Sequence, residues 1–184
     1  GISVMETDLG EYILQLAHEP PSHIVAPAVH KSKEQVAELF AAAHHKPLLN
    51  DIPAMTREAR EQLRSHFLGA DMGISGANFI IAETGTTLTV TNEGNADLVT
   101  TVPRIHCVVT GIEKVIPTLE DFATLIRLLP RSAIGQSIAN YLTLTTGIKA
   151  PGESDGPEQM HIVLVDAGRT RLVGSDMKDM LRCI

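Results

Sequence analysis

One stretch of the chain, residues 69–95 (GADMGISGANFIIAETGTTLTVTNEGN), gathers the side chains best suited to chemistry. Within it Glu83 follows an apolar run and precedes a glycine turn, which places its carboxylate at the mouth of that turn. A carboxyl group held in a partly dry pocket can transfer protons near neutral pH. We therefore take Glu83 as the first catalytic candidate, and Asp71 and Glu93 as weaker candidates for the same pocket.

The glycines and small polar residues of this stretch allow two interpretations. Glycine permits positive φ and close backbone approach, so the stretch could form a pocket for a small polar or phosphorylated ligand. It could equally build tight turns, with Glu83 accepting hydrogen bonds from the turn at residues 84–86. Spacing alone does not decide between them. The residues that would line such a pocket are Gly76, Asn78, Thr84, Gly85, Thr86, Asn92, Glu93, Gly94 and Asn95.

Further candidates lie outside that stretch. Arg131 and Ser132, just after Pro130, could bind an anion, because Arg offers forked donors and Ser a hydroxyl. His30, next to Lys31 at the end of a predicted strand, is the histidine most suited to face a pocket. The chain contains neither H-E-x-x-H nor C-x-x-C, so we expect no metal site built wholly within it. Rossmann and P-loop glycine motifs are also missing from the sequence.

Composition limits the classes of function. The 184 residues carry a formal net charge of −7, which argues against a nucleic-acid surface and against binding to anionic lipid. There is no apolar run of 18 residues, so we expect no membrane span. The two cysteines, Cys107 and Cys183, make no disulfide framework, which favours a cytoplasmic location. Cys107 lies in an apolar run and is expected to be buried.

The hydrophobic pattern predicts strands alternating with amphipathic helices. Thr7 caps a first helix, and Ser32 and Gln35 form a capping box for a second. The other predicted elements are strands at residues 23–29, 78–82, 86–91, 105–109, 141–145 and 162–165, helices at 56–69 and 119–129, and a polar loop at 91–97. Continuously apolar strands are typical of sheets buried on both faces. The pattern indicates an α/β fold with an open, mainly parallel sheet, flanking helices and some antiparallel hairpins.

Four segments together resemble the lactate utilization protein B family. They are ETDLGEYILQLAHEPPSHIVAPAVHKSKEQVAELF (residues 6–40), GADMGISGANFIIAETGTT (69–87), NEGNADLVTTVPRIHCVVTGIEKVIPTLED (92–121) and LLPRSAIGQ (128–136). They cover more than half of the chain, in order. The resemblance implies a LUD domain with a NagB/RpiA/CoA-transferase-like fold. It also implies a bacterial role beside partner subunits in oxidising L-lactate to pyruvate.

The same resemblance implies how the chain is divided. Residues 1–180 would be a LUD domain shortened on its N-terminal side, and residues 181–184 would begin a ferredoxin-like iron–sulfur domain. In the family Cys183 opens a run of cysteines that ligate a 4Fe–4S cluster. One thiolate cannot hold a cluster, so Cys183 is a ligand only in the full-length protein, and we expect no cofactor in residues 1–184.

Three functions remain open at this level. The first is an iron–sulfur electron-transfer component of L-lactate oxidation, with other lactate-utilization subunits as partners and L-lactate or another small anion as ligand. The second is a small-molecule enzyme of the isomerase or CoA-transferase type that uses Glu83, by analogy of fold alone. The third is a docking module without chemistry. We expect residues 1–184 alone to be inactive, and a second copy could cover exposed apolar surface.

Overall fold

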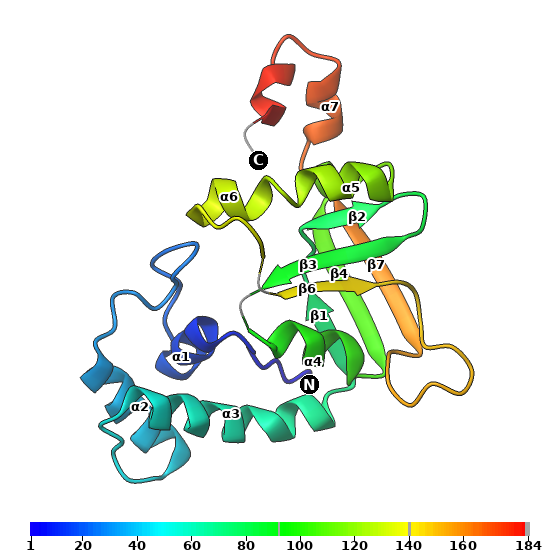
Figure 1. The fold of residues 1–184 in the computed structure, drawn as a ribbon. Coiled ribbons are helices and arrows are strands. Elements are labelled where there is room, and N and C mark those ends of the chain that lie inside the picture. Colours follow the sequence, from blue (N-terminus) through cyan, green and yellow to red (C-terminus); the bar gives the residue numbers. More distant parts are fainter. Residues whose placement is uncertain (92, 140, 183–184) are drawn as a thin grey trace. The chain divides into compact units, whose positions relative to one another are not determined.

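The structure is a computed structural model that describes residues 1–91, 93–139 and 141–182. It divides into two compact units, Gly1–Gly69 and Ala70–Ile184 (Figure 1). Among the described residues, no helix has the length and apolar character needed to cross a bilayer.

The first unit consists of three helices, α1 (Leu9–Ala17), α2 (Lys33–His44) and α3 (Ile52–Gly69). Asp8, rather than the predicted Thr7, caps α1, because its carboxylate accepts a hydrogen bond from the Gly10 N–H. The predicted capping box of Ser32 and Gln35 is confirmed at the start of α2. The three helices bury one apolar core, made of Tyr12, Ile13, Ala37, Phe40, Met55, Ala59 and Leu63.

The strand predicted at residues 23–29 is wrong, because these residues form an exposed loop of bends and turns. The Nδ1 atom of His23 accepts hydrogen bonds from the backbone N–H groups of Val25 and Ala26, at 3.1 and 3.0 Å. These local bonds replace a strand ladder, and Pro27 has no N–H to donate to one. Ile24 is 95% exposed, so the apolar run marks a loop rather than core.

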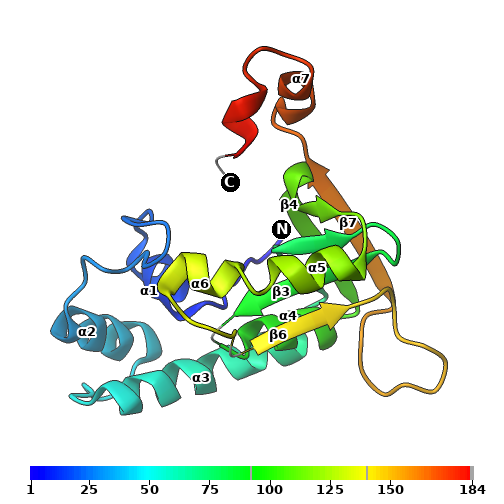
Figure 2. The same cartoon turned by 45° about the horizontal axis from the view of Figure 1, so that its top comes forward.

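The second unit contains two sheets. The first sheet is fully parallel and joins β1 (Met72–Ser75), β4 (Ile105–Gly111) and β7 (Gln159–Val165) in the order β1-β4-β7. Figure 2 shows β7, drawn in orange, along one edge. The second sheet has the order β5-β2-β3-β6.

In the second sheet β2 (Phe79–Ile81), β3 (Thr86–Thr91) and β6 (Tyr141–Thr145) pair antiparallel, whereas β5 (Val115–Ile116) pairs parallel with β2. A parallel sheet, antiparallel pairs and flanking helices confirm the predicted α/β class. The predicted strand at residues 86–91 is also confirmed in its bounds.

Short helices pack against these sheets. α4 (Asn95–Thr101) contacts β1, and α5 (Leu119–Leu125) contacts β2. The single helix predicted at residues 119–129 is instead two, because α6 (Leu129–Ile134) takes Pro130 into its first turn, where a missing N–H is tolerated. α7 (Arg169–Val173) and the 3₁₀ segments Ile112–Lys114 and Lys178–Arg182 complete the unit. α4 also begins inside the predicted loop at residues 91–97.

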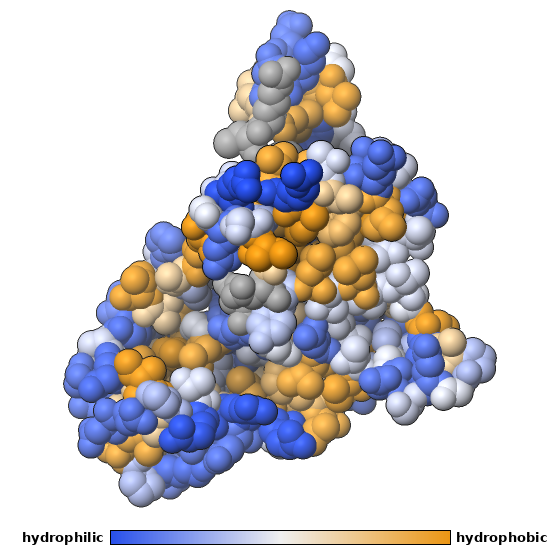
Figure 3. Space-filling model, in the orientation of Figure 1, coloured by the Kyte–Doolittle hydropathy of each residue, from blue (hydrophilic) through white to orange (hydrophobic). Residues whose placement is uncertain are grey.

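The expectation that β4 and β7 are buried on both faces is wrong for the structure as it stands. His106, Val108 and Thr110 of β4 are buried, whereas Val109 on the opposite face is 41% exposed. β7 is exposed along most of its length. Cys107 lies on the same face as Val109 and is half-buried rather than buried. In the view of Figure 3, apolar side chains (orange) likewise reach the surface of the second unit between hydrophilic ones.

Candidate functional site

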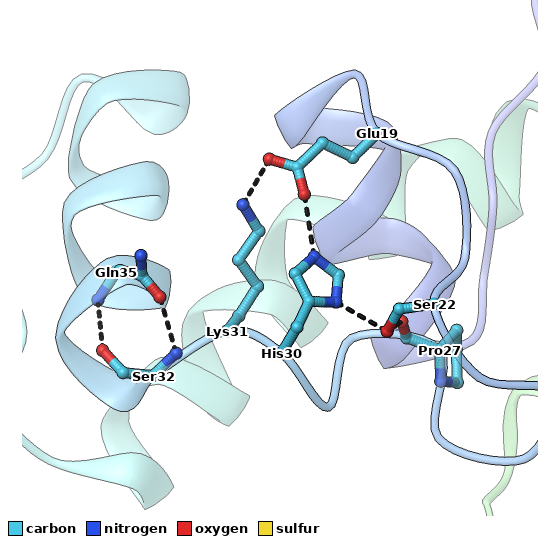
Figure 4. Close-up of polar contacts among 7 residues, drawn as sticks. All are labelled: Glu19, Ser22, Pro27, His30, Lys31, Ser32 and Gln35. Carbon is cyan, nitrogen blue, oxygen red and sulfur yellow. Dashed lines mark hydrogen bonds and ion pairs between the residues drawn. The ribbon is translucent and has the colours of Figure 1, made fainter.

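A cluster of polar side chains surrounds His30 in the loop between α1 and α2 (Figure 4). The His30 Nε2 atom lies 2.8 Å from the Glu19 carboxylate, and its Nδ1 atom lies 2.7 Å from the Ser22 hydroxyl. The second oxygen of Glu19 accepts a hydrogen bond from the Lys31 ammonium. We call Glu19, Ser22, His30 and Lys31 the His30 cluster.

The local sequence folds this loop back on itself. Pro20 and Pro21 follow the end of α1, and the chain then turns so that the Ser22 N–H and hydroxyl both approach the Pro27 carbonyl, at 3.1 and 3.0 Å. Pro27 is buried and anchors the turn. The loop thus brings Glu19 to His30 and Lys31, which are 11 and 12 residues away in sequence.

The electrostatics of the cluster favour an ionised Glu19. Hydrogen bonds from Lys31 and then His30 lower the pKa of Glu19 below its ordinary value. His30 bridges a carboxylate and a hydroxyl, an arrangement that can relay a proton between the two.

An apolar pocket of about 310 Å³ lies beside Lys31. Its walls come from all three helices and from the loop before α2, and of the described residues that line it Lys31 and Lys33 are charged. The remaining lining residues are Leu9, Ile13, Ala28, Val36, Phe40, Ile52, Met55 and Thr56. Such a pocket suits a ligand with an apolar part and a negatively charged group.

A second, buried network holds α2 against α3 in the same unit. The Tyr12 hydroxyl lies 2.8 Å from His44 Nε2, and His44 Nδ1 lies 3.1 Å from Glu58, without the alignment of a hydrogen bond. Lys46 donates to Glu58 at 2.8 Å and lowers the pKa of that carboxyl below its ordinary value. Burial lowers the pKa of His44 despite the nearby carboxylate. These contacts join residues of α1, α2 and α3, which favours a structural role.

The residues predicted to share a pocket in residues 69–95 lie at separate places. Asp71 precedes β1, whereas Gly76 follows it, so the two lie at opposite ends of that strand. The Asn78 side chain accepts a hydrogen bond from the Val90 N–H, which places it where β3 ends. Glu83 lies near the start of β3. The length of that strand, at the usual rise per residue, separates Glu83 from Asn78 by about 17 Å.

The turn between β2 and β3 holds the predicted residues 83–86. Gly85 takes a positive φ of 69°, as a tight turn requires. The Thr84 and Thr86 hydroxyls are hydrogen-bonded at 2.7 Å, and Thr86 also bonds to Thr146 at 2.7 Å. These contacts stabilise the turn and the adjoining strand.

Glu83 itself is exposed, and its carboxylate accepts a hydrogen bond from the Leu119 N–H at 2.7 Å. It therefore caps the first residue of α5, beside the capping box of Thr118 and Asp121. The predicted bond from Glu83 to its own turn is replaced by one to a helix 36 residues away.

The remaining candidates are dispersed. Gly94 is the N-cap residue of α4 and Asn95 its first residue, and the Glu93 N–H donates to the Thr91 hydroxyl at 2.7 Å. Arg131 and Ser132 are exposed in α6. Asn92 and Cys183 lie outside the described residues.

Comparison with known proteins decides the family. The family model of the LUD domain matches residues 1–165, which is most of the chain. The chain belongs to the LUD domain family. The resemblance drawn from the four sequence segments is thereby confirmed.

Two relatives of this LUD chain carry the name lactate utilization protein B. The protein from Lysinibacillus sphaericus is 51% identical and that from Geobacillus kaustophilus 49% identical, each over 185 residues. Each match covers 100% of the LUD chain and 39% of the relative, so the chain spans about two fifths of their length. A solved DUF162 family protein from Deinococcus radiodurans has 18% identity and a TM-score of 0.41, over 88% of this chain and 84% of its own.

The residues of the LUD chain do not by themselves fit an iron–sulfur cluster. A 4Fe–4S cluster takes several thiolate ligands, and the 184 residues contain two cysteines, 76 positions apart. Among the described residues, no three His, Cys, Asp or Glu side chains are grouped to hold a metal ion. Any cluster ligands besides Cys183 would have to come from other parts of a longer chain.

Of the predicted binding residues, only His30 lies in the His30 cluster. Sequence reasoning missed its partners Glu19, Ser22 and Lys31, because the segment between them was interpreted as a strand. A usable signal was present in residues 18–31, HEPPSHIVAPAVHK, where paired prolines and a third proline interrupt an apolar run.

Proposed function

We propose that this chain is the LUD portion of an iron–sulfur electron-transfer component in the oxidation of L-lactate to pyruvate. The observation that carries the proposal is 51% identity to a lactate utilization protein B across the entire chain. Other lactate-utilization subunits would be its partners, and a cytoplasmic location suits both that role and the low cysteine count.

The proposal divides the work between two parts of a longer protein. Electron transfer would belong to a region that begins near Cys183 and continues beyond residue 184, within a chain as long as the relatives. The LUD portion would bind the small carboxylate. The His30 cluster and its adjoining pocket support this assignment, since Lys31 both pairs with Glu19 and lines the pocket.

In this arrangement each feature of the cluster has a role. The Lys31 ammonium would release the Glu19 carboxylate and bind the carboxylate of the ligand instead, because a lysine can donate to either carboxylate. The methyl group of lactate would lie against the apolar wall. His30, which bridges Glu19 and Ser22, would hold or move the hydroxyl proton.

The electron-transfer part is tested on the full-length protein purified without oxygen. We expect stoichiometric iron and sulfide and a visible absorbance band that bleaches on reduction. The second test uses a bacterial strain that lacks its own lactate utilization protein B. We expect the gene for this chain's full-length protein to restore growth of that strain on L-lactate. Growth on pyruvate should not require the gene. A well-folded protein without iron, or a strain that still fails to grow on L-lactate after receiving the gene, would refute the proposal.

The binding part is tested by calorimetry with L-lactate and pyruvate on the same full-length protein. Lys31→Met should weaken binding at least tenfold, whereas Lys178→Met, which removes an exposed lysine of the second unit, should leave it unchanged. Equal binding by both variants would remove the His30 cluster from the proposal. It would leave the electron-transfer part standing.

A further inference from the structure

One face of the first sheet in the second unit is apolar and open to solvent. The registers of β1, β4 and β7 place Met72, Ile74, Cys107, Val109, Val163 and Val165 on this face. Ile74 is 62% exposed, Met72 47% and Val163 46%. We call this surface the open face.

Most of the open face is uncharged, but at its Gly111 end the Glu113 carboxylate, paired with Arg169 at 2.9 Å, lies over the strand. Its other polar members are Gln159 and His161, both on β7. Parallel sheets are covered on both faces in known folds, and soluble proteins rarely leave large contiguous apolar patches in water. The apolar residues of this surface therefore require an apolar cover.

The connections within the second unit go to the other face. Gly73 lies on that opposite face, where a Cβ atom would meet the Val99 carbonyl oxygen of α4 at 2.0 Å. Crossovers between parallel strands are almost always right-handed. Because the order β1-β4-β7 advances in one direction, right-handed crossovers place both connections on one face. Apart from Glu113 beside Gly111, the chain from β1 to β7 therefore leaves the open face uncovered.

We propose that the open face is the packing surface for amphipathic helices of the same polypeptide that lie outside residues 1–184. The inference rests on the proposed function in one respect, that the chain belongs to a protein as long as the lactate utilization proteins B. Their matched region is 39% of their length, so most of such a chain is available. Helices over a parallel sheet usually come from its own chain, which favours this occupant over a second copy.

The test uses the full-length chain with a photoreactive residue, Val163→p-benzoylphenylalanine. After irradiation we expect intramolecular cross-links to peptides outside residues 1–184, found by mass spectrometry at the mass of the monomer. The matched control is Thr124→p-benzoylphenylalanine, an exposed position in α5, which should not join the same peptides. Cross-linked dimers, cross-links to residues 1–69, or no protein cross-link would each overturn the proposal.

A second measurement does not depend on the photoreaction. In the full-length chain Val163→Lys should lower the Tm by several degrees, because a buried apolar side chain becomes a charge. Thr124→Lys should leave the Tm unchanged. Equal melting of both variants would show that Val163 stays in water. Neither measurement involves iron or lactate, so failure here and failure of the proposed function are separate results.

Discussion

At the scale of single residues, Glu83 shows how a chemically suggestive position can serve the fold. Its place after an apolar strand and before a glycine is visible in the sequence, and the turn it opens is present. Its partner, the Leu119 N–H, is 36 residues away and could not be identified by local pattern. A capping role explains the position without a reaction.

Capping and catalysis predict different responses to two substitutions. Glu83→Ala should lower the free energy of unfolding by about 1 kcal/mol, because the Leu119 N–H loses its acceptor. Glu83→Gln should change it little, since the amide oxygen can accept the same bond. Urea denaturation measures both, with Glu120→Ala as an exposed control in the same helix. Full stability of Glu83→Gln together with lost lactate-dependent activity would instead support a catalytic Glu83.

A buried histidine gives the second unit a dependence on pH. His106 is 1% exposed, its Nε2 atom lies 2.8 Å from the Ser75 hydroxyl, and burial lowers its pKa below the ordinary value. The unfolded chain therefore takes up a proton as the pH falls below about 6.5, while the folded chain does not. Stability should consequently decrease toward acid pH until the folded-state pKa is passed.

The comparison of variants isolates that effect. Between pH 7.5 and 5.5 the urea midpoint of the second unit should fall less for His106→Leu than for the unchanged chain. Thr124→Leu, which changes an exposed position in α5 that does not titrate, should follow the unchanged chain. An identical pH dependence in all three proteins would mean that His106 does not titrate differently on folding.

At the scale of secondary-structure elements, the contact between α4 and β1 depends on a missing side chain. A Cβ atom on Gly73 would lie 2.0 Å from the Val99 carbonyl oxygen, far inside van der Waals contact. The same atom on Gly76 would lie 3.9 Å from its nearest neighbour, the Val109 carbonyl oxygen. Gly73→Ala should therefore destabilise the second unit by about 1–3 kcal/mol, and Gly76→Ala by less than about 0.5 kcal/mol. Chemical denaturation would show the difference, and equal midpoints would mean that α4 moves away without cost.

Elements defined by their own local bonds could be predicted, and those defined by distant partners could not. The capping box of Ser32 and Gln35 and the alternation of residues 86–91 each carry enough local information. Residues 23–29 have the composition of a strand, but no strand in the described part of the chain pairs with them, and His23 holds their backbone instead. The His30 cluster follows the same rule: His30 was identified, whereas Glu19 and Ser22 reach it only because the loop folds back.

At the scale of the whole molecule, each unit has a core of its own. Leu63 belongs to the buried cluster of the three helices, and Leu88 belongs to the cluster between the second sheet and α5. Removing most of a buried leucine side chain typically costs about 2–5 kcal/mol. Truncating either leucine should therefore destabilise the unit that contains it more than the other unit.

Hydrogen exchange can measure this separation directly. Leu63→Ala should increase amide exchange throughout α1, α2 and α3 and leave protection in β3 close to that of the unchanged chain. Leu88→Ala should give the reverse pattern. Loss of protection in both units from either substitution would show that they unfold as one cooperative body.

The edge position of β7 has a consequence for how the polypeptide survives in a crowded cell. A strand that exposes backbone donors and acceptors along its rim, and carries the run Ile162 to Val165, is a template for pairing with strands of other molecules. Such segments are sites of aggregation when they remain uncovered during synthesis. The yield of active protein would then depend on a chaperone or on rapid folding of the segment that covers the β7 edge. Single charged residues placed along β7 should raise the solubility of residues 1–184 expressed alone.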